Sequence, residues 1–129
     1  MITNLLTVGL GGFLGAISRY CIFLLDDHFY HESEFPLGTL VVNLSGSLLI
    51  GIALGLSVKF NILSRGSFSH YIFVTGFLGT FTTFSTFSQD SFQLLTEKHY
   101  WFFIGNIILN VALGIALAAL GYFLITKKI

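Results

Sequence analysis

The sequence predicts an all-α integral membrane protein with four transmembrane helices, the third broken near its centre, in a single domain over residues 1–129. Composition is the first reason: 54% of residues are hydrophobic and 9% charged, with a mean hydropathy of +0.86, whereas roughly 25% are charged in soluble domains. The second is four apolar stretches long enough to cross ~30 Å of hydrocarbon. These spans cover about residues 5–25, 37–58, 70–92 and 100–125. The third is a run of glycine, hydroxyl and phenylalanine residues inside the third span.

The first span carries small residues and one charge. Gly11, Gly12 and Gly15 form a small-residue surface that lets another helix approach closely. Arg19 is the charged residue that we place inside a span, where it either extends to the membrane interface or faces an aqueous vestibule. The single cysteine, Cys21, excludes an internal disulfide. The formal net charge of zero gives no indication of a nucleic-acid partner, and the expected surrounding is a lipid bilayer.

The connection after the first span, residues 26–36, is acidic and carries two histidines. No pair in it has metal-ligand spacing on a predicted helix, so we do not expect a metal site there. In the second span, Asn43 puts an amide group near the membrane centre. An amide at that depth needs partners or water, so Asn43 is a candidate either for helix–helix contact or for the lining of a pore.

The third span contains the most informative stretch, from Gly76 to Ser88. Phenylalanines alternate there with six hydroxyl residues: Thr80, Thr82, Thr83, Ser85, Thr86 and Ser88. On a continuous helix Thr82, Ser85 and Thr86 would share one face, and Phe84 and Phe87 would share the opposite one. We interpret the stretch as a helix broken or kinked near Gly79 that lines a polar path. The alternative is structural, with hydroxyls bonded to their own helix and phenylalanines packed against lipid or protein.

The fourth span begins with the aromatic pair Tyr100 and Trp101, which suit a membrane interface. Asn106 and Asn110 lie one turn apart on the same face, as contacts between helices or as part of the path. Four spans bring both termini to one side of the membrane. That side collects most of the cationic residues, which favours cytoplasmic termini. They are Lys59, Arg65, Lys127 and Lys128, against Lys98 on the other side.

The predicted polar groups are uncharged donors, which suit a small anion better than a cation. The positive edges of phenylalanine rings can also contact an anion. We place no Asp or Glu inside a span, which argues against a proton-coupled cation exporter. A break near Gly79 would free backbone carbonyls, and Na⁺ is one group that such carbonyls bind. No nucleophile–base pair or metal-ligand cluster indicates an enzyme.

Three motifs resemble the CrcB/Fluc family of bacterial fluoride channels. They are Gly11-Gly-Phe-Leu-Gly-Ala-Ile-Ser-Arg-Tyr20, Gly38-Thr-Leu-Val-Val-Asn-Leu-Ser-Gly-Ser47 with Gly51, and Gly76-Phe-Leu-Gly-Thr-Phe-Thr-Thr-Phe-Ser-Thr-Phe87. The resemblance implies a passive, fluoride-selective channel of the bacterial plasma membrane that exports toxic fluoride from the cytoplasm. It also implies an antiparallel, dual-topology dimer with two narrow pores.

The resemblance further implies roles for individual residues. A structural, non-transported Na⁺ at the dimer centre would be held by the backbone carbonyls of Gly79 and Thr82, and Arg19 would lie near the vestibule at a helix interface. The expected pore and fluoride-binding residues are Asn43, Phe84, Phe87, Ser85, Thr86 and, in the fourth span, Asn110. The family pattern usually has Tyr or Ser at the positions of Asn106 and Asn110, so this end of the path differs.

Other readings remain open at this stage. The uneven loop charge allows either a homodimer or a heterodimer with a paired homologue of opposite orientation. A different class of protein, a small four-span exporter of cationic drugs, would be favoured by drug resistance without a fluoride phenotype. A non-conducting scaffold would tolerate alanine at Asn43, Phe84 and Phe87 without loss of ion flux.

Overall fold

The structure is a computed structural model that describes residues 1–30 and 33–127. His31, Glu32 and Lys128, which belong to the charge pattern above, lie outside these residues. The described part of the chain contains helices and connections and no β-strand. The helices are α1 (Ile2–Tyr30), α2 (Leu37–Phe60), the π-helix η1 (His70–Leu78), α3 (Gly79–Phe81), α4 (Phe84–Thr96), α5 (Tyr100–Ile108), the π-helix η2 (Leu109–Leu113) and α6 (Gly114–Thr126).

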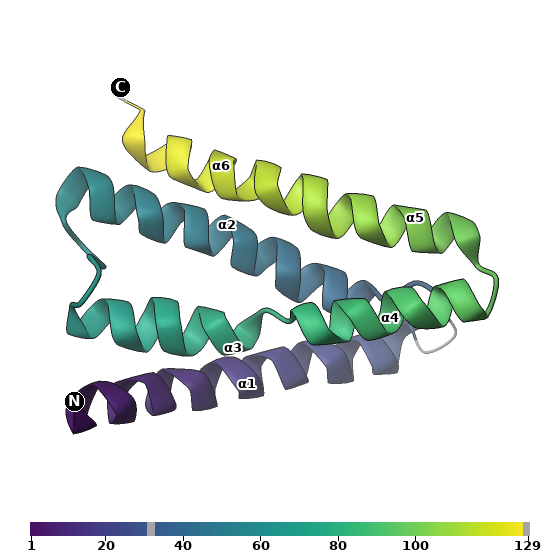
Figure 1. Ribbon diagram of the computed structural model, residues 1–129, viewed down its shortest axis with the longest axis horizontal. Coiled ribbons are helices and arrows are strands. Elements are labelled where there is room, and N and C mark those ends of the chain that lie inside the picture. The colour runs from purple at the N-terminus through teal and green to yellow at the C-terminus, as the bar shows by residue number, and fades with distance from the viewer. Residues whose placement is uncertain (31–32, 128–129) are drawn as a thin grey trace.

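The helices form four elongated rods that run back and forth along one direction (Figure 1). Both termini and the α2–η1 connection lie at one end, and the α1–α2 and α4–α5 connections lie at the other. The principal contacts join α2 to α6 and α1 to η1. Three of the rods are long and apolar enough to cross a membrane: α1, α2 and the continuous rod Tyr100–Thr126. The remaining rod is made of η1, α3 and α4.

The observed helices begin where three of the predicted spans begin, at Leu37, His70 and Tyr100. The helix of the first span is longer than the span itself, because it continues to Tyr30. The acidic residues Asp26 and Asp27 therefore lie on the last turns of α1 and not in a connection as expected. Lys59 likewise lies within α2.

Glycines make close helix packing possible at both principal contacts. A methyl group on Gly11 would collide with the backbone of Ile72 in η1, and one on Gly51 would collide with the carbonyl of Ala118 in α6. Backbones can approach this closely only where side chains are minimal. The first contact confirms that the glycine surface predicted for the first span is a helix-packing surface.

Few large side chains are buried in this chain. The buried hydrophobic residues are Val42, Ala53, Leu78, Phe81, Phe87 and Leu94. Large exposed apolar side chains occur along α1, α2 and α6. Such a surface suits hydrocarbon, because a helix in lipid gains little by hiding apolar groups from its surroundings.

The third rod is interrupted at Thr82 and Thr83. Both residues have extended backbones, with φ −76° and ψ 159° at Thr82 and φ −150° and ψ 114° at Thr83. Gly79 is helical, with φ −63° and ψ −25°, so the interruption follows the position near Gly79 at which we expected it. Thr82 consequently does not share a continuous helix with Ser85 and Thr86, and the expected common face was wrong on this point.

Candidate functional site: an amide-lined break between α3 and α4

Asn43 on α2 pairs with the backbone at the break. Its Oδ1 accepts a hydrogen bond from the Thr83 amide at 2.9 Å, and its Nδ2 donates to the Thr83 carbonyl at 3.2 Å. In a continuous helix the Thr83 amide would donate to the Gly79 carbonyl. One side chain therefore satisfies backbone groups that the break would otherwise leave without partners in the membrane.

The Asn43 amide also starts a chain of hydrogen bonds across the molecule. Its Nδ2 donates to Asn110 Oδ1 at 2.8 Å, and Asn110 Nδ2 donates to Asn106 Oδ1 at 2.8 Å. Asn106, which is fully buried, donates to Ser91 Oγ on α4 at 3.0 Å. The expected proximity of Asn106 and Asn110 is thus confirmed, and both belong to one polar network. Ser91 was missed, because a lone serine on a helix gives no sequence signal.

Thr83 organises the hydroxyl groups at the start of α4. Its Oγ1 accepts a hydrogen bond from the Thr86 amide at 3.2 Å and lies 3.0 Å from Thr86 Oγ1 and 3.3 Å from Ser85 Oγ. Thr83 is the N-cap of α4, a position at which threonine is favoured because its oxygen satisfies a free amide. Sequence reasoning left Thr83 out of the site, although this preference could have identified it.

The two phenylalanines of the predicted site have different surroundings. Their ring centroids are 5.6 Å apart with an interplanar angle of 51°. Phe87 is buried with 9% of its surface exposed, whereas Phe84 is 78% exposed. The pair therefore has one ring inside the chain and one ring on an open face.

An open cavity of about 380 Å³ lies beside the break. It collects five of the predicted site residues: Asn43, Gly79, Thr82, Phe84 and Asn110. The other lining residues are Gly46, Ser47, Ile50, Val74, Leu78 and Thr83. Phe87, Ser85 and Arg19 do not line it, and Thr86 lines a different cavity.

Arg19 lies at the break from the side of α1. Its Nη1 donates to the Thr82 carbonyl at 3.4 Å, and the Thr82 hydroxyl donates to the Leu78 carbonyl at 3.0 Å. The Gly79 carbonyl lacks its usual helical donor, because the Thr83 amide donates to Asn43. Two backbone oxygens, those of Gly79 and Thr82, are thus left with weak or missing partners inside the chain.

A second cavity, of about 310 Å³, lies at the end with the α1–α2 and α4–α5 connections. Its acidic lining residues are Asp26, Glu34, Asp90 and Glu97. Asp90, on α4, accepts a hydrogen bond from the buried Thr39 at 2.6 Å. Asp90 belongs to residues 70–92, the range expected for the third span, so the expectation that no span contains a carboxylate does not agree with that range.

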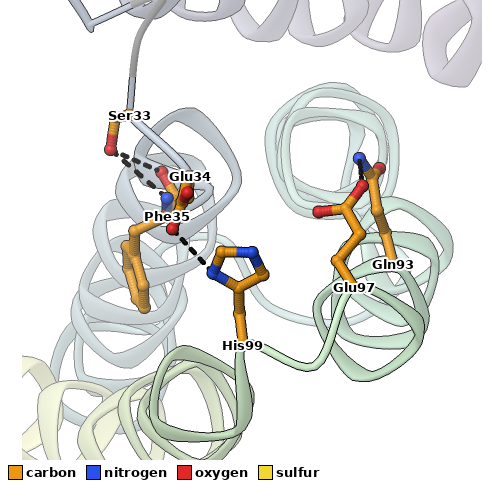
Figure 2. A network of polar contacts seen from close by, with 6 residues as sticks. All are labelled: Ser33, Glu34, Phe35, Gln93, Glu97 and His99. Carbon is orange, nitrogen blue, oxygen red and sulfur yellow. Dashed lines mark hydrogen bonds and ion pairs between the residues drawn. The ribbon is translucent and has the colours of Figure 1, made fainter.

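Hydrogen bonds and an ion pair connect residues at the rim of this second cavity (Figure 2). The His99 ring points to Glu34 and its Nδ1 lies 2.6 Å from the carboxylate, which joins the α1–α2 connection to the start of α5. Gln93 donates to Glu97 at 2.9 Å within the last turns of α4. Among the described residues, no group of three or more His, Cys, Asp or Glu side chains could hold a metal ion.

Comparisons with known proteins cover nearly the whole chain. Residues 6–122 match the family described as CrcB-like protein, Camphor Resistance (CrcB). A protein of Azobacteroides pseudotrichonymphae is 41% identical over 96% of this chain and 97% of its own length. A protein of Campylobacter lari is 42% identical over 95% of this chain and 97% of its own. A protein of Desulfotalea psychrophila is 36% identical over 98% and 94%, respectively. All three are named "Fluoride-specific ion channel FluC".

Proposed function

The chain belongs to the CrcB-like family, and we propose that it is a fluoride-specific ion channel whose permeation path passes the break between α3 and α4. It is a channel and not an enzyme. The observation that carries the placement of the path is the cavity at which amide groups, hydroxyl groups and an exposed ring meet around Asn43. We further propose that the flux is passive and relieves the cytoplasm of toxic fluoride.

The chemistry of this cavity suits a small anion that must lose water. Removing an ion from water costs on the order of 20 kcal/mol in an idealised low-dielectric medium, so closely spaced donors must replace the lost hydration. The amides of Asn43 and Asn110 are such donors. The bond from Asn43 Nδ2 to the Thr83 carbonyl, at 3.2 Å, is longer than its bond to Asn110, at 2.8 Å. A fluoride ion at Asn43 would therefore exchange with the Thr83 carbonyl first.

Phenylalanine rings supply the remaining contacts. The edge of an aromatic ring carries partial positive charge, so Phe84 and Phe87 can flank an anion without hydrogen-bonding it. The two rings are neighbours on α4, and their centroids are 5.6 Å apart. Ser85 and Thr86 would extend the donor path along the same helix, towards the second cavity that Thr86 lines.

We infer that the interrupted rod also crosses the membrane, as the third of four spans. It runs from His70 to Thr96 and is comparable in length to the other three rods. An irregular backbone is tolerated at membrane depth only where protein or a cavity satisfies it. The pairing of Asn43 with Thr83 supports this reading.

The open face around Phe84 supports an assembly of two subunits. A ring that is 78% exposed beside the cavity that Asn43 and Asn110 line leaves a permeation path incomplete in one chain. A second subunit, inserted in antiparallel orientation, would close the cavity and complete two pores. The partner is either the same chain or a paired homologue of opposite orientation.

A structural Na⁺ between the two subunits fits the same face. Na⁺ is a hard cation that binds oxygen ligands, and the carbonyls of Gly79 and Thr82 are oxygen ligands of this kind. Both have weak or missing partners within the chain. Two carbonyls do not complete a coordination shell, so the matching pair from a partner subunit would be needed. The ion would hold the broken segments together.

We place the channel in the bacterial plasma membrane with its termini in the cytoplasm. The end that carries the termini includes the end of α2 with Lys59, the α2–η1 connection with Arg65, and Lys127 directly after α6. The α4–α5 connection at the opposite end contains Lys98. Positive residues favour the cytoplasmic side. In a dual-topology homodimer this preference would be weak, so the charge bias supports the heterodimer or a dominant orientation.

A cation exporter is the alternative from another class. Asp90 removes one argument against it, because this carboxylate belongs to residues 70–92, which we propose as the third span. The family membership and the names of the relatives favour the fluoride channel. Drug resistance conferred by this chain without any fluoride efflux would instead support the exporter.

Fluoride efflux from liposomes tests the proposal. Liposomes that contain only this chain would be loaded with fluoride and chloride, and both anions would be measured outside. Fast fluoride loss with chloride retained is expected, and would show that one gene product suffices. Liposomes with the chain and a paired homologue serve as the second arm. Absence of fluoride loss in both arms would overturn the proposal.

A further inference from the structure

A third cavity, of about 590 Å³, opens at the end of the molecule that carries the α2–η1 connection. It lies between α2 and η1, and its polar lining residues are Ser57, Asn61, Ser64, Arg65 and His70. Ile50 and Val74 line both this cavity and the cavity beside the break. The two cavities therefore adjoin along Ile50 and Val74, and we interpret them together as one groove from the α2–η1 connection to Asn43.

The backbone of the α2–η1 connection holds this mouth of the groove in a defined shape. Asn61 has a left-handed backbone with φ 57° and caps the end of α2. Its backbone N–H donates to the carbonyls of Leu56 and Ser57. Ser64 Oγ donates to the Asn61 side-chain oxygen at 2.6 Å, and His70 Nδ1 lies 3.0 Å from the Leu63 carbonyl. These contacts position Arg65 at the mouth and leave Asn61 Nδ2 as a hydrogen-bond donor.

Charge is distributed unevenly between the two ends of the molecule. Arg65 is an exposed guanidinium that lines the mouth of the groove. The carboxylate side chains of the described residues belong to the end of α1, the α1–α2 connection, α4 and its C-cap, and all of them except Asp27 line the second cavity: Asp26, Asp27, Glu34, Asp90 and Glu97. Between Arg65 and the break, the shared part of the groove is lined by the apolar residues Ile50 and Val74. Low-dielectric walls of this kind focus the field of a fixed charge along a cleft.

We propose that Arg65, together with the side-chain amide of Asn61, forms a collecting site for hydrated monovalent anions at the mouth of this groove. The site rests on the proposed function, because its ligand is the anion that then moves on to Asn43. The cavity is large enough for the ion to keep its water there. Arg65 raises the local anion concentration without dehydrating the ion, and the amides at the break exchange the water afterwards.

The test measures initial fluoride flux in liposomes with Arg65→Gln, at low fluoride concentration and at two ionic strengths. In low salt the flux should fall roughly threefold to tenfold, since a focused charge changes arrival rates by such factors. At saturating fluoride the flux should match that of the unchanged chain. In about 1 M inert salt, where the screening length is about 3 Å, the difference should disappear. Arg65→Lys should restore most of the flux.

Lys59→Gln is the matched control. Lys59 is a cation at the same end, but it does not line the cavity and its Nζ donates to the Ile125 carbonyl at 2.7 Å. Flux near that of the unchanged chain is expected. An equal loss of fluoride flux in Lys59→Gln would show that surface charge in general, and not a collecting site at Arg65, causes the effect. Unchanged flux in Arg65→Gln would overturn the inference alone, whereas no flux in the unchanged chain, both by itself and together with a paired homologue, would overturn the proposed function with it.

Discussion

Asn43 illustrates how much of this site depends on single side chains. An asparagine amide has both donors and acceptors, so it can pair with an N–H and a C=O at once. Asn43 does so with Thr83, and its remaining capacity binds Asn110. Its depth in an apolar span made it a candidate from the sequence. Its partner at the break was not predictable, because Thr83 is 40 positions away along the chain.

Replacing Asn43 by aspartate should abolish most of the fluoride flux. The substitution keeps the size but removes the Nδ2 donors to Thr83 and Asn110, and it places an anionic group on an anion path. An unsatisfied buried polar group costs about 1–3 kcal/mol. A flux loss of about tenfold or more is expected, because 1.4 kcal/mol added to a barrier lowers a rate about tenfold.

Liposome efflux measures the effect, with Ser45→Ala as the control on the same helix. Ser45 Oγ donates within α2 to the Val41 carbonyl and does not line the cavity. Normal flux in Asn43→Asp with intact folding would contradict the placement of the path at Asn43.

Phe84 and Phe87 should contribute differently to stability and similarly to flux. Phe84→Ile removes an exposed ring, so the free energy of unfolding should change by less than about 0.5 kcal/mol. Phe87→Ile alters a buried ring and should cost up to about 1.5 kcal/mol. Both substitutions remove a ring edge, and both should strongly reduce fluoride flux.

Phe92→Ile is the control, since Phe92 is an exposed ring of α4 outside the cavity. Thermal unfolding in detergent and liposome efflux are measured on the same preparations. Undiminished flux in both Phe84→Ile and Phe87→Ile would exclude a role for ring edges.

At the scale of elements, the molecule has two closely packed helix contacts, α2 with α6 and α1 with η1, and an interruption in the rod that contains η1. The packed pairs depend on glycines such as Gly51, which bring backbones together. The interruption depends on Thr83, whose side chain caps α4 and whose backbone pairs with Asn43. The sequence, with glycines at Gly76 and Gly79, led us to expect the break near Gly79. Their actual roles differ: Gly76 lets α1 approach η1, and Gly79 is helical.

Gly51→Ala should weaken the contact between α2 and α6. The new methyl group would meet the carbonyl of Ala118, which is part of a helix backbone and cannot move independently. Overpacking of this kind costs about 1–3 kcal/mol. A lower midpoint of thermal unfolding in detergent is expected.

The matched variant is Gly9→Ala on α1, where a methyl group meets nothing within 4 Å. Alanine also favours helix formation over glycine, so this variant should be neutral or slightly stabilised. Equal destabilisation of the two variants would show that close α2–α6 packing is not the cause.

At the scale of the whole molecule, the two ends and the open face define how the chain is used. One end carries the termini, Arg65 and the third cavity, and the other carries the acidic second cavity. The cavity beside the break lies between them and opens to the surface next to the exposed Phe84. A single chain thus offers a polar path with one side missing, which is the basis for proposing a second subunit.

Removing Na⁺ should weaken the proposed dimer. If carbonyls of Gly79 and Thr82 from two subunits share one ion, replacing NaCl by N-methylglucamine chloride leaves those oxygens without the cation that they bind in the assembly. The fraction of dimer, measured by native mass spectrometry in detergent, should fall and should recover on returning Na⁺. A dimer fraction that is the same in both salts would remove Na⁺ from the proposal, while leaving the channel itself untouched.

The sequence by itself determined the helical membrane class, the starts of the later helices and the family. Each of these depends on local composition, helix-length apolar runs or contiguous motifs, as in Gly76–Phe87. It also pointed to Asn43, Phe84 and Asn110, which line the cavity beside the break, because polar or ring-rich positions are conspicuous in an apolar span. Only the tertiary structure decided that the break lies at Thr82 and Thr83 and that Asn106 and Ser91 join the polar network. The physical reason is that backbone groups in the membrane need partners, and those partners come from helices that are distant in sequence.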